Sequence, residues 1–246
     1  MKRDPEFDVI VFGATGFTGR LVAAYLVDRY GADRDVSWAM AGRSQAKLEA
    51  VRDEIGAPPS TPLVVADSTD DASLTAMAER TRCVLTTVGP YLWYGEGLVR
   101  ACAETGTDYV DLSGEVLWMH DMIERYHAPA VETGARIVHS TGFDSIPFDL
   151  GVLFLQQAAE ERFGSTCQRV RTRVIDMRGS FSGGTAAAGR ATIEAIQADP
   201  GLFALLLDPF SLTDGFAGPE QPDGDKVIEE DIMGGWSGPF FMAPIN

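Results

Sequence analysis

Short apolar runs alternate with helix-like stretches along about the first 140 residues of the chain. Each run is continuous rather than alternating, which is typical of a parallel strand that is buried on both faces. The stretches between the runs place apolar residues three or four positions apart, as an amphipathic helix does. The predicted strands are Val9–Phe12, Val36–Ala41, Leu63–Ala66, Cys83–Val88, Tyr109–Leu112 and Arg136–His139. The predicted helices between them are Gly19–Tyr30, Gln45–Ile55, Asp70–Thr81, Gly95–Thr105 and Leu117–Thr133.

This alternation predicts an α/β fold, a doubly wound parallel sheet of the Rossmann type with helices on both faces. Right-handed crossovers make 3-2-1-4-5-6 the default strand order. Ligands of such sheets bind beyond the carboxyl ends of the strands. The glycine, proline and polar turn residues of this chain follow the strands, so we expect the functional site at that edge of the sheet.

The pattern changes after Ser140. A helix is predicted at Asp149–Phe163, after a turn-rich loop, and a helix of small residues at Ala186–Ala198. Val170–Met177 alternates apolar and polar residues, which predicts a half-buried antiparallel strand. Because the chain ends on the apolar segment Trp236–Asn246, we expect it to stop inside a domain. The sequence therefore predicts two domains, an NAD(P)-binding domain at 1–147 and an incomplete mixed α+β domain for substrate binding or oligomerisation at 148–246.

Composition narrows the classes of function. The formal net charge of −16 argues against a nucleic-acid partner and against a polybasic contact with membranes. The three cysteines, Cys83, Cys102 and Cys167, have no spacing of a disulfide framework or a metal site. With no signal-peptide core or membrane span in the sequence, we expect a cytoplasmic protein without a metal.

The first strand runs directly into three glycines at three-residue spacing. Gly13 allows the backbone angles of a turn, Gly16 leaves room for a diphosphate, and Gly19 allows the helix to pack closely. The positive end of the helix dipole would then face the phosphates. This G-x-x-G-x-x-G spacing differs from the best-known dinucleotide fingerprint, and a turn without a ligand is the alternative. The predicted phosphate-binding residues are Gly13, Ala14, Thr15, Gly16, Phe17, Thr18 and Gly19.

The residue after the second strand indicates which cofactor binds. An acidic side chain there would bind the ribose 2′-hydroxyl of NAD, whereas a basic side chain would bind the 2′-phosphate of NADP. Arg43 and Ser44 stand at this point, so we expect NADP(H) rather than NAD(H); a solvated surface arginine is the alternative. Contacts to the adenine and to the ribose beside the nicotinamide are predicted after the third and fourth strands, at Asp67, Ser68, Thr87, Val88, Gly89 and Pro90.

The catalytic group is harder to predict. No tyrosine here has the Tyr-x-x-x-Lys spacing of short-chain dehydrogenases, and no G-x-S-x-G elbow occurs. Hydride transfer needs little from the protein beyond positioning and a donor where negative charge develops. Tyr91 and Tyr94 follow the fourth strand, near the expected nicotinamide, and Asp144 and Ser145 follow the sixth. Each could donate a hydrogen bond, relay a proton or bind substrate, and a structural role is the alternative for each.

Several motifs occur together in a fixed order over nearly the whole chain: Gly13–Gly19, Ala41–Ser44, Thr86–Tyr91, Tyr94–Gly95, Gly106–Glu115, Gly142–Pro147 and Ser182–Thr185. In this combination the chain resembles the saccharopine dehydrogenase-like oxidoreductases, and within them the actinobacterial trans-acting enoyl reductases. The resemblance implies an NAD(P)-binding Rossmann domain followed by a mixed α/β domain. It also implies relatives longer than this chain. Phe148 is a departure, since similar sequences tend to carry serine there.

Three functions are open at this point. The leading one is an NADP-dependent reductase of an enoyl or carbonyl group in a hydrophobic, lipid-like small molecule. The second is a saccharopine-dehydrogenase-type oxidoreductase of amino acids or imines, which would need an arginine cluster for substrate carboxylates. The third is a non-catalytic dinucleotide-binding scaffold. A homodimer and a peripheral association with lipid or membrane are compatible with each. The arginines available for a carboxylate site are Arg169, Arg171, Arg173, Arg178 and Arg190.

Overall fold

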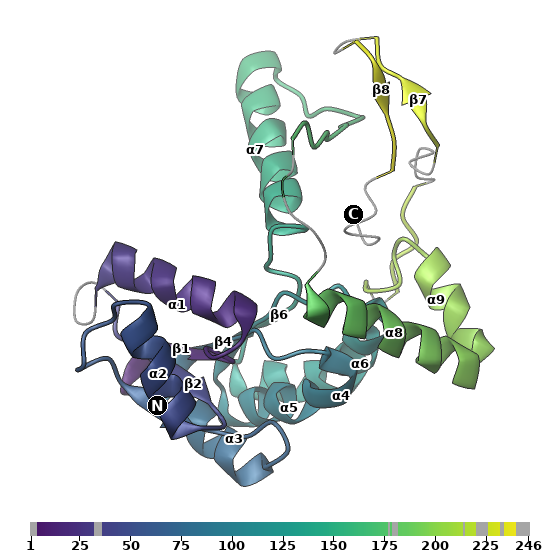
Figure 1. Cartoon of the computed structure of the whole chain (residues 1–246). Coiled ribbons are helices and arrows are strands. Elements are labelled where there is room, and N and C mark those ends of the chain that lie inside the picture. The colour runs from purple at the N-terminus through teal and green to yellow at the C-terminus, as the bar shows by residue number, and fades with distance from the viewer. Residues whose placement is uncertain are drawn as a thin grey trace.

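The computed structural model describes residues 4–31, 36–176, 178, 182–213, 215–219, 226–231 and 234–239. Its main feature is a six-stranded sheet in the order β3-β2-β1-β4-β5-β6, in which all neighbouring strands run parallel (Figure 1). The predicted doubly wound sheet and its strand order are therefore confirmed. The strands are β1 (Phe7–Phe12), β2 (Trp38–Gly42), β3 (Leu63–Val65), β4 (Thr81–Thr86), β5 (Asp108–Val110) and β6 (Ile137–Val138).

Helices cover both faces of this sheet. Val11 and Met40 belong to the core beneath α1 and α2, whereas Ile10 and Phe12 belong to the core beneath α3, α5 and α6. Neighbouring residues of β1 thus point into opposite cores, which is the reason that its apolar run is continuous. The helices are α1 (Phe17–Tyr30), α2 (Gln45–Glu54), α3 (Asp71–Ala78), α4 (Tyr91–Tyr94), α5 (Glu96–Thr105) and α6 (Val116–Thr133).

Helices α2 and α3 each begin at a short polar side chain that caps the first turn. The Ser44 hydroxyl accepts a hydrogen bond from the backbone N–H of Lys47 at 3.4 Å, and the Asp70 carboxylate accepts one from Ala72 at 3.1 Å. Ser44 is thus the N-cap of α2. The single-turn helix α4, which begins after Pro90, is absent from the prediction. It matters because it places Tyr91 and Tyr94 beside the carboxyl end of β4.

The remaining elements are α7 (Ile146–Phe163), α8 (Gly183–Ala198), the 3-10 turn η1 (Pro200–Leu202), α9 (Phe203–Leu207) and the antiparallel pair β7 (Ile228–Glu229) and β8 (Trp236–Ser237). Helix α7 projects away from the sheet, whereas α8 runs beside α4 (Figure 1). Leu206 and Leu212 pack against the core of the sheet domain, so this later region completes that core. The proposed division between 147 and 148 stays a prediction.

The strand predicted at Val170–Met177 is wrong for residues 170–176, which form neither strand nor helix, and Met177 lies outside the described residues. An alternating segment becomes a strand only when a neighbouring strand pairs with its backbone. No described strand pairs with 170–176. None of the described helices is both long and apolar enough to cross a bilayer.

Candidate functional site

The glycine loop joins β1 to α1 at the carboxyl edge of the sheet. The carbonyl of Ala41 accepts hydrogen bonds from the backbone N–H groups of Gly13 (3.0 Å) and Ala14 (3.1 Å), which ties the loop to β2. Gly13 has a φ of +90°, and a β-carbon there would lie 2.7 Å from the Thr87 hydroxyl. Gly13 is therefore required by the backbone conformation and by the close approach of the β4 end.

The amino terminus of α1 is left open by this loop. Its N-cap is Gly16, and no described side chain caps the first turn. Gly16 and Phe17 are exposed, so the first N–H groups of the helix stand at a solvent-accessible edge. Free N–H groups combined with the positive end of the helix dipole form an anion-binding arrangement. The predicted phosphate site thus has the required shape, although the contacts themselves stay predictions.

Positive charge lies beside this loop, at the end of β2. Arg43 is exposed, and Lys47 lines a shallow cavity of about 270 Å³ together with Thr15 and Arg20. Hydrogen bonds from Thr69 and, to a smaller extent, the positive charge of Arg43 hold the pKa of Asp67 below its usual range. Asp67 therefore lies within electrostatic reach of Arg43, a relationship that the sequence alone did not indicate.

The end of β4 contacts the glycine loop directly. The Thr87 hydroxyl donates to the Phe12 and Gly13 carbonyls at 3.4 and 3.3 Å. The residues predicted to approach the nicotinamide ribose, Thr87–Pro90, therefore lie beside the predicted phosphate loop. Ser68 follows β3 at the same edge of the sheet. The structure thus gathers the predicted cofactor-binding residues along one edge.

Tyr91 is buried rather than exposed to the edge. Its hydroxyl donates to the Thr86 carbonyl at 3.2 Å and accepts from the Leu112 N–H at 3.4 Å. Burial and the negative charge of Asp111 raise its pKa far above the usual tyrosine value. The ring also packs on Trp118 with a centroid distance of 5.2 Å. Its hydroxyl is thus engaged within the protein, and a role toward substrate stays a prediction.

The other predicted catalytic residues lie in different environments. Tyr94 is exposed and meets Trp93 edge-on. Asp144 is half-buried, and burial raises its pKa. Ser145 is buried at the start of α7, and its Oγ has no hydrogen-bond partner among the described residues. The structure therefore places Asp144 and Ser145 together after β6, whereas Tyr94 lies apart on α4.

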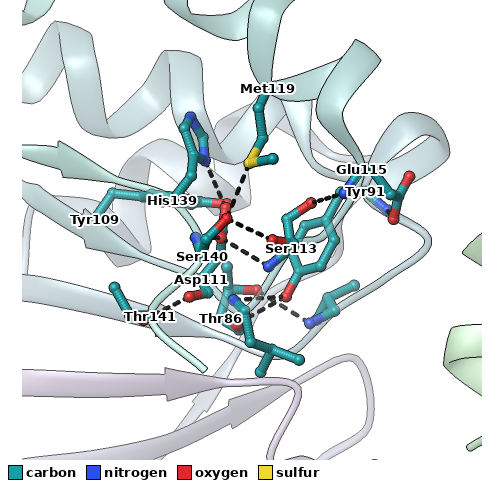
Figure 2. Close-up of polar contacts among 12 residues, drawn as sticks. Thr86, Tyr91, Tyr109, Asp111, Ser113, Glu115, Met119, His139, Ser140 and Thr141 are labelled. Atoms are coloured by element: carbon teal, nitrogen blue, oxygen red, sulfur yellow. Dashed lines mark hydrogen bonds and ion pairs between the residues drawn. The ribbon is translucent and has the colours of Figure 1, made fainter. Parts of the chain in front are cut away.

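A buried polar network joins the ends of β5 and β6 (Figure 2), and Asp111 and His139 within it were not among the predicted site residues. Asp111 lies at its centre. Its Oδ2 accepts a hydrogen bond from the Tyr109 hydroxyl at 2.9 Å and lies 2.7 Å from Nδ1 of His139. Its Oδ1 accepts from the backbone N–H groups of Ser113 and Ser140 at 2.9 and 2.8 Å. One carboxylate thus holds both strand ends in register.

Glu115 is a second buried acidic side chain. Its two carboxylate oxygens accept hydrogen bonds from the backbone N–H groups of Tyr91 (2.8 Å) and Leu92 (2.9 Å), at the start of α4. Burial raises the pKa of Glu115 despite these bonds, and Asp111 adds to the effect. The signal that could have identified Asp111, Glu115 and His139 is their position, because all three follow the adjacent strands β5 and β6.

Residues 9–138 match the family described as the saccharopine dehydrogenase NADP-binding domain. This match covers more than half of the chain. The chain belongs to this family. The resemblance inferred from the motifs is therefore confirmed. The family binds NADP, so the preference for NADP(H) predicted from Arg43 is confirmed for the domain, while the individual contacts stay predictions.

Named relatives agree with this assignment. A trans-acting enoyl reductase of Mycobacterium ulcerans is 42% identical over 252 residues, and one of Mycobacterium tuberculosis (strain H37Rv) is 40% identical over 251. Both alignments cover 98% of this chain and 59% of the relative, so the chain spans less than two thirds of their length. Saccharopine dehydrogenase (L-Glu forming) from Saccharomyces cerevisiae, a solved structure, has a TM-score of 0.48 and 22% identity, covering 64% of this chain and 32% of that one.

Proposed function

We propose that the protein is an NADPH-dependent reductase of an enoyl or carbonyl group in a hydrophobic, lipid-like small molecule. Membership in the NADP-binding family carries this proposal. The open amino terminus of α1 and the positive charges of Arg43 and Lys47 support it. The enoyl group is favoured because relatives that are 40 and 42% identical are named trans-acting enoyl reductases.

The residues at the carboxyl edge have separate roles in this proposal. The backbone of the glycine loop, Gly13–Gly19, holds the diphosphate, and Arg43 with Ser44 binds the 2′-phosphate. Asp67 and Ser68 contact the adenine, and the Thr87–Pro90 segment contacts the ribose beside the nicotinamide. Bound NADPH would supply a hydride to the electrophilic carbon of the substrate. The protein then needs a donor for the negative charge that develops on the carbonyl oxygen.

The donor is proposed among the residues that follow β4 and β6. Tyr91, Tyr94, Asp144 and Ser145 are the candidates from the sequence. Asp144 has a raised pKa because of burial, which extends the pH range in which its carboxyl group can donate a proton. The Ser145 hydroxyl has no hydrogen-bond partner among the residues that the structure describes. These two observations favour the β6 side of the edge over the engaged Tyr91 hydroxyl.

The imine alternative receives less support from the arginines it needs. Arg173 forms an ion pair with Glu230, Arg190 pairs with Glu194 at 2.7 Å, and Arg178 approaches Asp176 at 3.8 Å. Three of the five arginines therefore lie within ion-pair distance of carboxylates of the chain itself. A substrate carboxylate would have to compete with them. We accordingly place the enoyl or carbonyl reductase first.

The test is cofactor binding followed by turnover. NADPH and NADH are titrated against the protein by fluorescence, and NADPH oxidation is then followed with enoyl thioesters, ketones and imino acids. We expect tighter binding of NADPH and turnover with enoyl thioesters or ketones. Turnover restricted to imino acids would support the second hypothesis, and tight NADPH binding without turnover of any class, by a chain of the relatives' full length, would support the scaffold.

A further inference from the structure

A small cavity of about 280 Å³ lies beside the end of β6, apart from the glycine loop. One part of its wall is apolar and is formed by Met119, Ile123, Val138, Ile146 and Leu212. The other part is polar and is formed by His139, Ser140, Ser145 and Asp149. An apolar wall with a few converging polar groups is the usual composition of a small-molecule site. The volume is just below the usual range, so it suits a short group rather than a whole lipid.

Asp111 fixes the orientation of His139 at this cavity. The Asp111 carboxylate accepts hydrogen bonds from a tyrosine hydroxyl and two backbone N–H groups, which suits its ionised form. The nitrogen of His139 that faces it, Nδ1 at 2.7 Å, therefore carries a proton. Figure 2 shows the ring with Nδ1 toward Asp111 and its other nitrogen directed away. Nε2 is thus the position at which His139 can gain and lose a proton.

The imidazole ring is also held by its neighbours. Trp118 and Tyr109 meet it edge-on, with centroid distances of 5.0 and 5.7 Å. The next residue, Ser140, has a φ of +58°, a backbone conformation that non-glycine residues adopt uncommonly. Ser140 is held there by its bonds to Asp111 and to the Ser113 carbonyl. Local backbone strain that is secured in this way is found most often at functional sites.

Ser145 adds an unpaired polar group to the same cavity. As the N-cap of α7, a serine would ordinarily accept a hydrogen bond from the first turn of the helix, but its side chain makes no capping bond. Its Oγ is buried without a partner among the described residues. A buried hydroxyl without a hydrogen-bond partner is energetically unfavourable unless a ligand or a water molecule forms a hydrogen bond with it. Ser145 therefore has a hydroxyl that can donate a hydrogen bond to an oxygen atom in the cavity.

We propose that this cavity binds the carbonyl end of an α,β-unsaturated thioester or ketone and that His139 is the catalytic acid of its reduction. This inference rests on the proposed reductase function. NADPH, when bound, would supply the hydride for the β-carbon, and the electron pair of the double bond would move toward the carbonyl as an enolate. Nε2 of protonated His139 gives its proton to the α-carbon of the enolate, which completes the saturated product, and solvent then reprotonates the ring. Ser145 donates a hydrogen bond to the same carbonyl oxygen.

Ionisable groups beside His139 come from two of the elements packed around it. Tyr109 of β5 and Asp111, which directly follows β5, face the ring, and Asp149 of α7 lines the cavity. Among the described residues, helix α6 contributes the uncharged Trp118, Met119 and Ile123 at this point. Because the proposed step uses the proton on Nε2, we expect kcat to decrease at high pH.

The test compares two substitutions of one residue. In His139→Asn the amide nitrogen stands near the position of Nδ1, so the bond to Asp111 is kept while the proton donor is lost. In His139→Gln the amide nitrogen stands near Nε2, which keeps a donor that cannot titrate. His127→Asn is the matched control, because His127 is an exposed histidine on α6. The substrate is a crotonyl thioester, whose acyl part is short enough for the cavity.

We expect His139→Asn to lower kcat by about a hundredfold or more, the usual contribution of general acid catalysis, with an unchanged Kd for NADPH. Both His139 variants should lose the decrease of kcat at high pH, and Ser145→Ala should raise KM. A wild-type protein that turns over while His139→Asn keeps its kcat and pH profile would overturn the inference and leave the reductase function intact.

If the wild-type protein oxidises no NADPH, that outcome contradicts the proposed function. A second measurement then tests whether the cavity binds a carbonyl group. The imidazole nitrogens are then followed by NMR while the saturated butyryl thioester is added with NADP⁺. A shift of the His139 signals that Ser145→Ala weakens would support the cavity as a carbonyl site. No shift would overturn the inference as well.

Discussion

A β-carbon on Gly19 would lie 2.1 Å from the carbonyl oxygen of Gly13. This is well inside any allowed contact, so α1 and the glycine loop can pack as they do only because residue 19 has no side chain. Gly16 differs, since a β-carbon there would lie 3.3 Å from the same oxygen. The three glycines therefore have unequal structural roles: Gly13 and Gly19 maintain the loop, and Gly16 is the one that the fold alone requires least.

The first prediction concerns Gly19. We expect Gly19→Ala to lower the free energy of unfolding by about 1–3 kcal/mol, because the added methyl group forces the helix away from the loop. Gly151→Ala is the matched control, since nothing lies within 4 Å of a β-carbon at this position inside α7. That variant should be more stable by roughly 0.5–1 kcal/mol, the helix preference for alanine. Urea unfolding measures both, and equal effects of the two variants would contradict the packing argument.

The second prediction concerns cofactor selection. Arg43→Ala should weaken the binding of NADPH far more than that of NADH, because only NADPH carries the 2′-phosphate. Asp67→Asn should act in the opposite direction and strengthen NADPH binding, since it removes a negative charge within reach of Arg43. Arg29→Ala, an exposed arginine in the last turn of α1, is the control and should change neither affinity. Equal losses of both cofactors in Arg43→Ala would exclude its contact with the 2′-phosphate.

The strand order and the cofactor edge were predictable because they depend on local signals. The apolar runs identify the strands, and the glycine and polar turns after them identify the edge at which parallel strands end. The strand predicted at 170–176 failed because alternation in a single segment carries no information about its partner. Arg173 of this segment pairs with Glu230, but that contact joins side chains and not backbones.

The polar network was not predictable in the same way. His139 and Asp111 are 28 residues apart, and neither has a sequence neighbour that indicates the pair. The ends of β5 and β6 bring them together only after the two strands are placed side by side. The position of two residues directly after adjacent strands is thus a usable signal for such a pair. The strand order must be known before this signal can be used. The burial of Tyr91 could not be predicted from the sequence for a related reason. It depends on helix α4 and on Glu115.

The third prediction concerns the two tyrosines of α4. Tyr91→Phe should lower the free energy of unfolding by about 1 kcal/mol, because its hydroxyl bonds to Thr86 and Leu112 are lost. Tyr94→Phe should leave stability unchanged, since Tyr94 is exposed. Thermal or urea unfolding gives the stability, and NADPH oxidation gives kcat. A tyrosine that donates a proton to substrate would lose about a hundredfold in kcat on substitution, so an unchanged kcat would exclude that role for the residue.

The last prediction concerns the pH dependence of stability at Glu115. Burial raises its pKa in the folded protein above the unfolded value of about 4.3. Between these two pKa values the folded state binds more protons than the unfolded state, so this group's contribution to stability decreases as pH rises through that window. Glu115→Gln does not titrate. We therefore expect the unfolding free energy of the wild type, minus that of Glu115→Gln, to decrease as pH rises above the unfolded pKa of about 4.3.

Glu96 provides a control of opposite sign for this experiment. Hydrogen bonds from Arg125 and Tyr126 hold the pKa of Glu96 below its usual value. Its contribution to stability is therefore present above the unfolded pKa and is lost as pH falls, so the difference between wild type and Glu96→Gln should increase with pH. Because Glu96 lies at the surface, its effect should also shrink at high salt, whereas that of Glu115 should persist. A Glu115 difference that is flat or that increases with pH would show that the hydrogen bonds from Tyr91 and Leu92 outweigh the cost of burying the charge.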